Sequence, residues 1–426
     1  MFLSREDFTR LDSKVGSVIK KDAPISSDIV VIYEHDALFY KQAVKQFTII
    51  LQKIGRLYYS KISSKEYDSQ IVALLEKNVP KEMIAYIRKD PPFLNFSRLD
   101  FQGRYVIEYN SSPGFVILTS TVEKSLEELG LLGKYKLKSS TKNSAAADKL
   151  LWNDVFSPLV KKAKHKSIAI LDRIGDGYST NIYGDLENLS KFISENSGTK
   201  AVFPCSDKDF DYKEGQLVHK KSGTAIGVVH IAASEGENFE RWIKLAGGPI
   251  MQAYKEGNVE LWPNLANSIF TSKFMLAYLS DAHFDSIFQI TPEERAFLND
   301  IIPWARILNH SIAQTAKWMV KNGLTVVIKP GHGSGGRGVY ILDKDKQYSY
   351  LLNKCTKEGN YICMSYAPAD KIRGEFSHTL DATIFLETPK AQANPDKIIL
   401  TSRVFKGGKV NTVSEGAGVS PVMIAD

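Results

Sequence analysis

The chain has 426 residues, and 43% of them are hydrophobic, which is enough for two or three packed units with a full core. This composition excludes a disordered chain. No run of about 18 apolar residues occurs, and the amino terminus lacks the apolar region of a signal peptide, so we expect a soluble, cytoplasmic protein. The net charge of +7, from 55 basic and 48 acidic residues, is spread along the chain. It fits a small anionic substrate and is too diffuse to argue for nucleic acid.

Three cysteines occur, Cys205, Cys355 and Cys363. Their spacings match neither a disulfide framework nor a zinc site. We therefore expect free, partly buried thiols that serve as packing residues.

The first part of the chain is predicted to form an apolar strand followed by long helices. The run IVVIY, residues 29–33, precedes apolar residues at helical spacing as far as residue 61. A second helical stretch is predicted near 66–88, and it ends before the paired prolines Pro91 and Pro92.

Two strands are predicted at 96–110, joined at Gln102 and Gly103, and the turn SSPG at 111–114 ends the second strand. Residues 133–150 are rich in Lys, Ser, Thr and Ala. We interpret them as an exposed connection or a surface helix at the boundary between two units.

The region 165–240 has the pattern of a βαβ unit, with a strand at 167–172, a helix at 184–198 that ends in glycine, and a second strand at 199–204. Residues 266–323 are predicted to be mostly helical, and Gly323 suits a helix terminus. We detect no internal repeats.

The stretch VVIKPGHGSGGRGVYIL, residues 326–342, places glycines between two apolar runs. Gly331, Gly333 and Gly336 have the spacing of a dinucleotide-binding fingerprint, but that fingerprint must open a helix, and here the glycines lead into a second strand. The stretch is therefore predicted to be a hairpin. Its backbone N–H groups can approach phosphate oxygens, with Lys329 as a nearby cation. An ordinary hairpin with a surface lysine is the alternative.

The segment RLDFQGRYVIEYNSSPG gathers oxygen donors on neighbouring strands. Asp100 lies on the first predicted strand, while Glu108 and Asn110 are two residues apart on the second and so share a face. Such hard oxygen donors suit Mg²⁺. The alternative is that the two acids are solvated strand carboxylates and Asn110 begins a turn.

This segment resembles the metal-ligand end of the ATP-grasp superfamily, in the version found in ATP-dependent amino-acid ligases that extend glutamate or lysine carrier substrates. The resemblance implies that Asp100, Glu108 and Asn110 bind Mg²⁺, with two ions bridging the phosphates of ATP. The glycine stretch resembles the phosphate-covering loop of the same superfamily, and ANSIFTSKFMLAYLSD resembles its earlier lysine segment.

The segment YICMSYAPAD resembles the linker strand that holds adenine, although Ser365 stands where most members carry a glutamate. That departure leaves the adenine or ribose contact open. The resemblance implies an ATP-binding set made of Lys273, Lys329, Gly331, Gly333, Ser334, Gly335, Gly336, Met364, Ser365 and Tyr366.

The segment SRVFKGGKVNTVSEGAGVSPV resembles the end of the ATP-grasp unit. It implies that Arg403 neutralises the transferring phosphate or the acyl intermediate, with Asn411 and residues 416–418 beside it. The implied catalytic residues are Arg403, Asn411 and Lys329. Four further residues are candidates for binding substrate: Arg373, Glu375, Asp172 and Arg173. A capped loop is an equal alternative for Asp172 and Arg173, which follow a predicted strand.

The order of these segments differs from that of an ordinary ATP-grasp chain, because the Asp…Glu-x-Asn segment comes first. The chain therefore resembles circularly permuted members such as glutathionylspermidine synthase and eukaryotic glutathione synthetase. Such an order requires the amino-terminal strands to pack beside the carboxyl-terminal segment, so that Asp100 reaches Arg403.

The implied fold is α/β (α+β), a circularly permuted ATP-grasp fold with a pre-ATP-grasp-like βαβ domain. Residues 1–145 form the amino-terminal part of the permuted unit, 150–265 the substrate domain and 266–426 the ATP-grasp lobes. Members of the superfamily are often dimers or tetramers, so a homo-oligomer is compatible with the resemblance.

The implied activity is that of an ADP-forming, ATP-dependent ligase that joins a small-molecule carboxylate to an amine through an acyl phosphate, with ATP and Mg²⁺ as cofactors. Two alternatives stay open: an ATP-grasp small-molecule kinase, and a catalytically degenerate nucleotide-binding scaffold. His230, His332 and His378 have no carboxylate or cysteine at a catalytic spacing, so we expect surface or hydrogen-bonded histidines.

Overall fold

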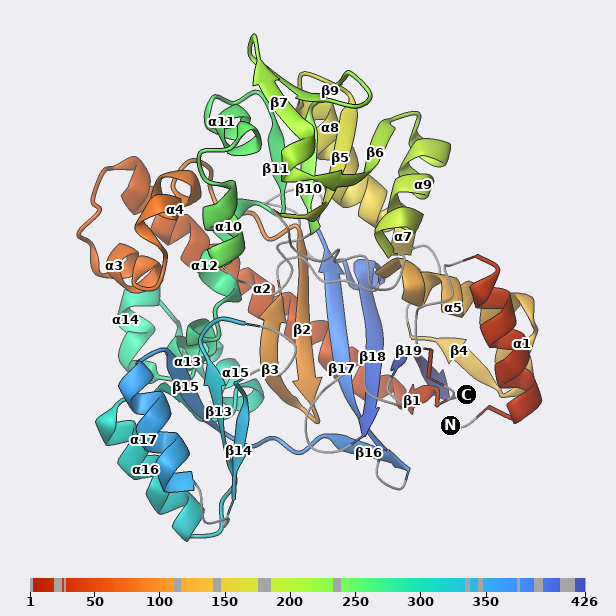
Figure 1. The fold of residues 1–426 in the computed structure, drawn as a ribbon. Coiled ribbons are helices and arrows are strands. Elements are labelled where there is room, and N and C mark those ends of the chain that lie inside the picture. Colours follow the sequence, from red (N-terminus) through yellow and green to blue (C-terminus); the bar gives the residue numbers. More distant parts are fainter. Residues whose placement is uncertain are drawn as a thin grey trace.

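The structure is a computed structural model that describes residues 3–18, 25–26, 28–110, 116–140, 147–174, 185–232, 239–333, 338–343, 348–373, 376–386, 394–406 and 418–425. Within these ranges the chain forms four β-sheets flanked by helices (Figure 1). The mixed α/β class expected from the sequence is confirmed.

The large sheet has eight strands and brings the two ends of the chain together. Its main path runs β1-β19-β18-β17-β2-β3, while β16 pairs with β17 and β4 pairs with β19. The amino-terminal hairpin β2-β3 thus lies directly beside the carboxyl-terminal strands (Figure 1). The strands are β1 (Val30–Ile32), β2 (Phe96–Gln102), β3 (Tyr105–Asn110), β4 (Leu137–Ser139), β16 (Asp370–Arg373), β17 (Phe376–Phe385), β18 (Ile398–Lys406) and β19 (Gly418–Ala425).

Helix α2 (Glu34–Ser63) packs across one face of the large sheet, as Figure 1 shows. Its side chains Phe47 and Ile54 belong to the same buried core as Leu99 of β2 and Leu380 of β17. Because side chains alternate along a strand, the polar residues between these apolar ones lie on the opposite face of the sheet. The long amphipathic helix predicted in this region is confirmed.

Two sequence expectations in this half differ in detail from the structure. The helical stretch near 66–88 is two helices, α3 (Gln70–Glu76) and α4 (Lys81–Ile87), because Pro80 has no N–H to continue the first helix and sits at the N-cap of the second. Residues 133–140 are not an exposed connection, since β4 pairs with β19 and Leu137 is buried.

The middle of the chain forms the predicted βαβ unit. Four parallel strands in the order β11-β10-β5-β6 pack against α9, and a three-stranded antiparallel meander follows β6 in the chain. The strands are β5 (Ser167–Arg173), β6 (Lys200–Ser206), β7 (Phe210–Lys213), β8 (Gln216–His219), β9 (Thr224–Ile226), β10 (Val228–Ile231) and β11 (Glu260–Trp262), and α9 spans Asp185–Ser197.

The third sheet is an antiparallel sheet of four short strands in the order β12-β15-β13-β14. Helices α16 and α17 pack together on its outer side (Figure 1). Strands β13 and β14 flank the glycine stretch and pair antiparallel, which confirms the predicted hairpin. The bounds are β12 (Ala305–Ile307), β13 (Val326–Pro330), β14 (Tyr340–Leu342), β15 (Tyr361–Ser365), α16 (His310–Lys321) and α17 (Tyr348–Glu358).

Short helices connect these units and cover their edges. None of the helices among the described residues combines the length and apolar character needed to cross a bilayer. All three cysteines are buried and free, as predicted. The remaining helices are α1 (Arg5–Gly16), α5 (Val116–Glu128), α6 (Leu131–Lys134), α7 (Ala147–Leu150), the π-helical segment Leu151–Phe156, α8 (Ser157–Lys162), α10 (Phe239–Leu245), α11 (Pro249–Lys255), α12 (Ser268–Thr271), α13 (Phe274–Leu279), α14 (Asp285–Phe288) and α15 (Pro292–Ile301).

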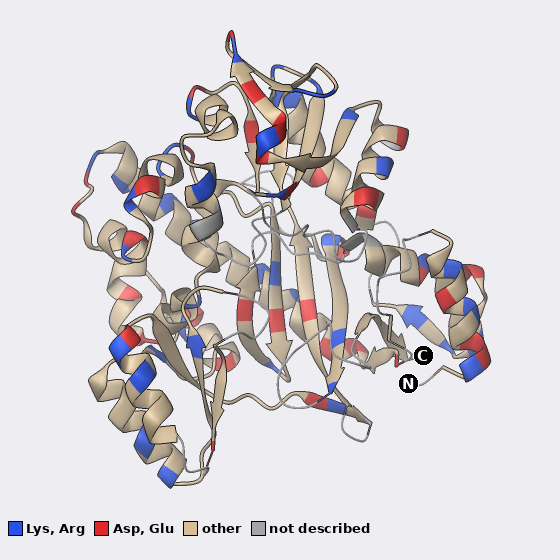
Figure 2. Ribbon diagram, in the orientation of Figure 1, with Lys and Arg blue, Asp and Glu red and all other residues tan. Residues whose placement is uncertain are grey.

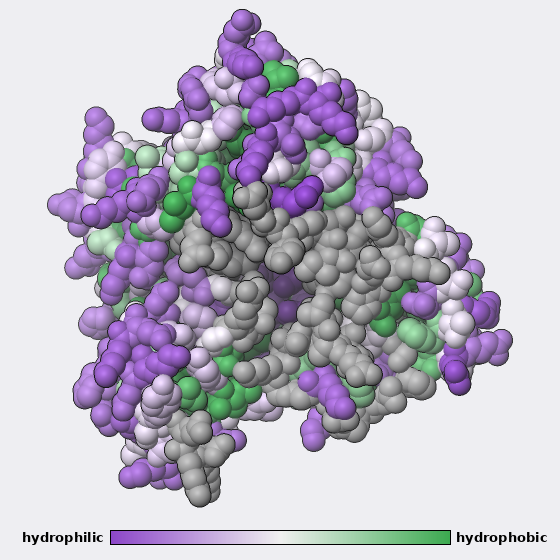
Figure 3. Space-filling model, in the orientation of Figure 1, coloured by the Kyte–Doolittle hydropathy of each residue, from purple (hydrophilic) through white to green (hydrophobic). Residues whose placement is uncertain are grey.

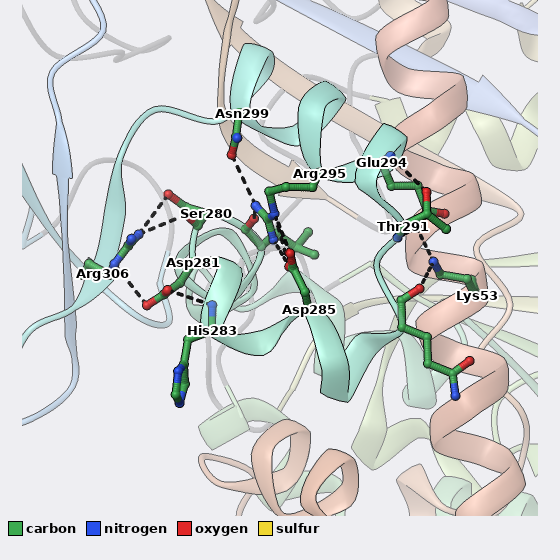
Figure 4. A network of polar contacts seen from close by, with 12 residues as sticks. Lys53, Ser280, Asp281, His283, Asp285, Thr291, Glu294, Arg295, Asn299 and Arg306 are labelled. Carbon is green, nitrogen blue, oxygen red and sulfur yellow. Dashed lines mark hydrogen bonds and ion pairs between the residues drawn. The ribbon is translucent and has the colours of Figure 1, made fainter.

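A polar network holds the end of α13 between the third sheet and α2 (Figure 4). Arg306 of β12 donates to the Ser280 carbonyl at 3.0 Å and pairs with Asp281 at 3.1 Å. Arg295 of α15 donates to the Leu279 carbonyl at 2.6 Å and pairs with Asp285. At the other end of the network, Lys53 of α2 pairs with Glu294. The segment that carries Lys273 is therefore fixed to two units at once.

We predict that Arg295→Ala lowers the free energy of unfolding by about 3 kcal/mol, because it leaves the partly buried Asp285 carboxylate and the Leu279 carbonyl without their donor. Denaturant unfolding measures this change. The matched control is Lys61→Ala, which removes an exposed ion pair with Glu66 and is expected to cost no more than about 0.5 kcal/mol. Equal effects of the two substitutions would contradict the role given to the network.

Candidate functional site

A group of six polar side chains lies on the face of the large sheet opposite α2. In the strand register Asp100 faces Glu108 of β3 on one side and Asp381 of β17 on the other. Figure 2 shows the resulting bands of acidic and basic residues across the middle of the strands, and Figure 3 shows hydrophilic atoms at the centre of the same view. The six residues are Arg98, Asp100, Glu108, Asn110, Asp381 and Arg403.

Four of these residues form a closely paired group, which we call the arginine–aspartate cluster: Arg98, Asp100, Asp381 and Arg403. Arg98 Nε donates to Asp100 Oδ1 at 2.6 Å, and Arg403 Nη2 donates to Asp100 Oδ2 at 2.7 Å. Arg403 also donates Nε and Nη2 to the two oxygens of Asp381, at 2.8 and 2.9 Å. Both carboxylates are fully buried, so these charge-assisted hydrogen bonds are what makes their burial tolerable.

The two aspartates differ in their electrostatic surroundings. Burial acts to raise the pKa of Asp100, but Arg403 and Arg98 together hold that pKa below its ordinary value. For Asp381, burial raises the pKa, and the neighbouring Asp100 carboxylate acts in the same direction against Arg403. Arg403, between them, has a raised pKa because two carboxylates outweigh the effect of its own burial.

Two lysines reach this face from outside the large sheet. Lys273, at the N-cap of α13, pairs with Glu108 Oε1 at 2.8 Å, and Lys329 of β13 donates to the Ile107 carbonyl at 3.3 Å. Burial lowers the pKa of Lys329 to about 8, and Glu108 partly offsets this effect while Lys273 adds to it. Both lysines therefore lie beside one carboxylate of the site.

The glycine hairpin is anchored to the same lysine segment. The Gly331 carbonyl accepts from the Lys273 backbone N–H at 2.9 Å and from the Ser272 hydroxyl at 3.2 Å, and the Gly333 carbonyl accepts from Lys273 Nζ at 2.7 Å. A Cβ added to Gly331 would lie 2.1 Å from the Phe274 ring, so only glycine fits this approach.

The donors suit a hard divalent cation only in part. Glu108 is 24% exposed and Asn110 is partly exposed, and such oxygen donors are what Mg²⁺ prefers. Asp100, in contrast, is 0% exposed and accepts from Arg98, Arg403 and the Asn110 amide. Among the described residues, no three His, Cys, Asp or Glu side chains gather as a metal site by themselves. The side chains that fit Mg²⁺ are thus Glu108 and Asn110, with Asp100 behind them.

The structure brings together most of the described residues that the sequence singled out: Asp100, Glu108, Asn110, Lys273, Lys329, Gly331, Gly333 and Arg403. Their roles stay predictions. Asn411, Ser334, Gly335, Gly336 and Glu375 lie outside the described residues, as do residues 416 and 417.

For the remaining described candidates, the structure gives no contact with this group. Arg373 ends β16, at the edge of the large sheet. Asp172 is buried near the end of β5 in the second sheet, and its nearest contact to the exposed Arg173 is 3.9 Å. Their assignment to substrate stays a prediction.

The expected adenine strand is β15, in the middle of the third sheet. The backbone N–H of Ser365 donates to the Trp304 carbonyl at 2.8 Å, and that of Tyr366 donates to the Thr325 carbonyl at 3.0 Å. Met364 pairs with strands on both sides. Two N–H donors expected near a base are thus engaged within the protein.

Sequence reasoning missed Arg98 and Asp381. Arg98 stands two residues before Asp100, and that spacing, which puts both on one face of a strand, was a usable signal. Asp381 lies in FSHTLDATIF, where a single acid in an apolar strand gives no indication of its partner until the register of β17 is known.

No family model matches the chain, and no curated protein matches it. Several solved structures do match the chain. A glutathione synthetase-like effector from Globodera pallida, in its apo form, superposes with a TM-score of 0.56 at 9% identity, over 99% of this chain and 97% of the other. A RimK-domain ATP-grasp protein from Sphaerobacter thermophilus gives 0.31 at 13% identity, over 60% of this chain and 90% of the other. D-alanyl-alanine synthetase A from Vibrio cholerae gives 0.30 at 10% identity, over 61% and 89%.

The first likeness extends over nearly all of both chains and shows a common fold. The other two are too distant to carry an argument about this chain. This chain therefore shares its overall fold with that glutathione synthetase-like effector. The contact that a permuted order requires, Asp100 with Arg403, is present, while the permutation itself stays a prediction.

We predict that Gly331→Ala destabilises the protein by roughly 1–3 kcal/mol, because the new methyl group meets the buried Phe274 ring beside Lys273. Thermal or denaturant unfolding measures the change. Gly133→Ala is the matched control, since no atom lies within 4 Å of its added Cβ in α6 and alanine favours a helix. A neutral Gly331→Ala would show that the hairpin does not need this close approach.

One predicted hydrogen-bonded histidine has a structural role. His230 is buried against Phe156 and Trp262, and its ring Nδ1 lies 3.3 Å from the Trp262 carbonyl. Burial lowers the pKa of His230 from 6.5 to about 4. The unfolded chain therefore binds a proton that the folded protein excludes between these two pH values, so acid favours unfolding.

We predict that His230 contributes about 2 kcal/mol to the loss of stability between pH 7 and pH 5, a window in which the unfolded chain gains its proton. The measurement compares the free energy of unfolding of the wild type and His230→Gln at both pH values. The variant should lose less stability on acidification. The same loss in both proteins would contradict the assignment.

Proposed function

We propose that this protein is an ATP-dependent ligase that joins a carboxylate to an amine, with an acyl phosphate as intermediate. The observation that carries the proposal is the ion pair between Lys273 and Glu108, which places the glycine hairpin and two lysines against the charged face of the large sheet. Two lysines, the described start of the glycine hairpin, and the carboxylate and arginine side chains of the sheet are thus linked by direct contacts, an arrangement suited to the phosphates of a nucleotide.

In the proposed reaction the carboxylate of one substrate attacks the γ-phosphorus of ATP, which releases ADP and gives an acyl phosphate. The amine of the second substrate attacks the acyl carbon, phosphate leaves, and the amine loses a proton, which yields the amide. Mg²⁺, when bound by Glu108 and Asn110, supplies charge neutralisation for the phosphates of ATP.

In the proposed reaction, basic side chains of this protein neutralise the negative charge of the ATP phosphates and of the transferring phosphoryl group. Lys273 and Lys329 offset the phosphates, and a Lys329 pKa near 8 keeps most of that side chain protonated at pH 7. Among the described residues, Arg403 Nη1 and Arg98 Nη1 donate to no acceptor, so each arginine retains a donor for an anion. Such donors, fixed before substrate binds, stabilise a transferring phosphoryl group.

The common fold with a glutathione synthetase-like effector supports a ligase ancestry and leaves the substrates open. The experiment is to incubate the protein with ATP, Mg²⁺ and pooled amino acids, short peptides, polyamines and carboxylates, while recording ADP release and new masses together. An amide-sized mass gain with ADP supports the proposal. A phosphate-sized gain on a hydroxyl substrate would instead identify a kinase, and nucleotide binding without turnover would identify a scaffold.

We predict that Glu108→Gln lowers turnover at least about 100-fold, because it removes a negatively charged oxygen ligand for Mg²⁺ and the ion-pair partner of Lys273. The rate of ADP release measures it. Glu66→Gln, which alters an exposed acid paired with Lys61, is the control and should leave the rate unchanged. Wild-type turnover in Glu108→Gln would remove Glu108 from the mechanism.

A further inference from the structure

Asp381 is a buried charge in the middle of the large sheet. It is 1% exposed, and its neighbours Leu380 and Ala382 point the other way, into the core against α2. Burying a carboxylate costs several kcal/mol unless it is paired and hydrogen-bonded. Replacing a whole buried ion pair by apolar residues is often neutral or stabilising, so stability alone does not explain the buried pair of Asp381 and Arg403.

The contacts of Asp381 are directed at Arg403. Its two oxygens accept Nε and Nη2 of the same guanidinium, at 2.8 and 2.9 Å, which is the fork geometry that fixes the plane of an arginine. Arg403 is 13% exposed, and its Nη1 group donates to no acceptor among the residues that the structure describes. Asp381 therefore determines where the remaining donor of Arg403 lies.

Asp100 cannot replace Asp381 in this task. It accepts a single hydrogen bond from Arg403, because Arg98 takes both of its oxygens and the Asn110 amide donates to Oδ2 at 3.3 Å. One hydrogen bond leaves a guanidinium free to rotate. If Arg403 moved fully onto Asp100, it would compete with Asn110 for the same oxygen.

We propose that Asp381 is a positioning residue, which holds Arg403 so that its Nη1 group meets the anionic carboxylate or phosphoryl group of the reaction. The inference rests on the proposed ligase function. Asp381 would orient the Arg403 guanidinium before the anion binds. An arginine already held by a bidentate carboxylate loses no rotational freedom on binding the anion.

The experiment compares Asp381→Asn with Thr379→Val. Thr379 is buried on the same strand and on the same face, and its hydroxyl has no hydrogen-bond partner among the residues that the structure describes, so Thr379→Val controls for a change in the sheet itself. With substrates found by the mass screen, we expect kcat to fall roughly 30- to 100-fold in Asp381→Asn at a temperature at which the variant is folded. The affinity for ATP, measured by calorimetry, should be unchanged in both variants.

A role that acts only through Arg403 also predicts non-additive effects. Asp381→Asn added to Arg403→Lys should lower kcat no more than about threefold further. Wild-type kcat in Asp381→Asn, or full additivity with Arg403→Lys, would overturn the inference. If Asp381→Asn does not fold, Asp381→Glu replaces it, because this variant keeps the charge and moves the carboxylate by one methylene. We expect the same fall in kcat for Asp381→Glu. A wild-type kcat in this variant would overturn the inference.

A second measurement separates this inference from the proposed function. In protein labelled with ¹⁵N-arginine, the Nε–H signal of Arg403 is assigned by its absence in Arg403→Lys. Its hydrogen exchange should accelerate at least about tenfold in Asp381→Asn and stay unchanged in Thr379→Val. If the wild type makes no product, the ligase proposal is wrong, but the hydrogen-exchange measurement still tests whether Asp381 positions Arg403. Unchanged exchange in Asp381→Asn would overturn the positioning role whatever the activity.

Discussion

The burial of two carboxylates between two arginines is the constraint on which the rest of the site depends. Asp100 and Asp381 lie side by side on neighbouring strands, and without Arg403 between them they would repel each other in a medium of low dielectric. A charge that is costly to bury holds the strands of the face in one register. The apolar core under α2 makes the sheet stable, and the charged face determines how its strands align.

The second constraint is the joining of separate units. Lys273 touches the glycine hairpin through its backbone and its side chain, and touches β3 through Glu108. The network around Arg295 and Arg306 keeps the following helix in place. A ligand that binds at Glu108 must therefore compete with an internal cation, so the position of the hairpin and the occupancy of the site are linked by one ion pair.

Much of this arrangement could be predicted from the sequence, because the signals were local. The glycine stretch, the β2-β3 hairpin with Asp100, Glu108 and Asn110, and the α2 pattern depend on spacing within short segments. The remaining features of the site depend on pairing between strands that are far apart in the sequence. Asp381 comes next to Asp100 and Arg403 only because β17 pairs with β2 and β18, and the sequence of β17 alone does not predict this pairing. The break at Pro80 was local and was overlooked within a strong apolar period.

The strand order has a consequence for synthesis. Arg403 and Asp100 are 303 residues apart, and β19, which follows both of them in the sequence, lies between β1 and β18. A chain emerging from the ribosome can complete the parallel sheet of β5, β6, β10 and β11 while the hairpin with Asp100 still waits for its partners. The large sheet can close only after β17, β18 and β19 have been synthesised. Until then the apolar side chains of α2 and the edge of β2 stay uncovered, so the folding of this sheet depends on contacts between residues that are far apart in the sequence.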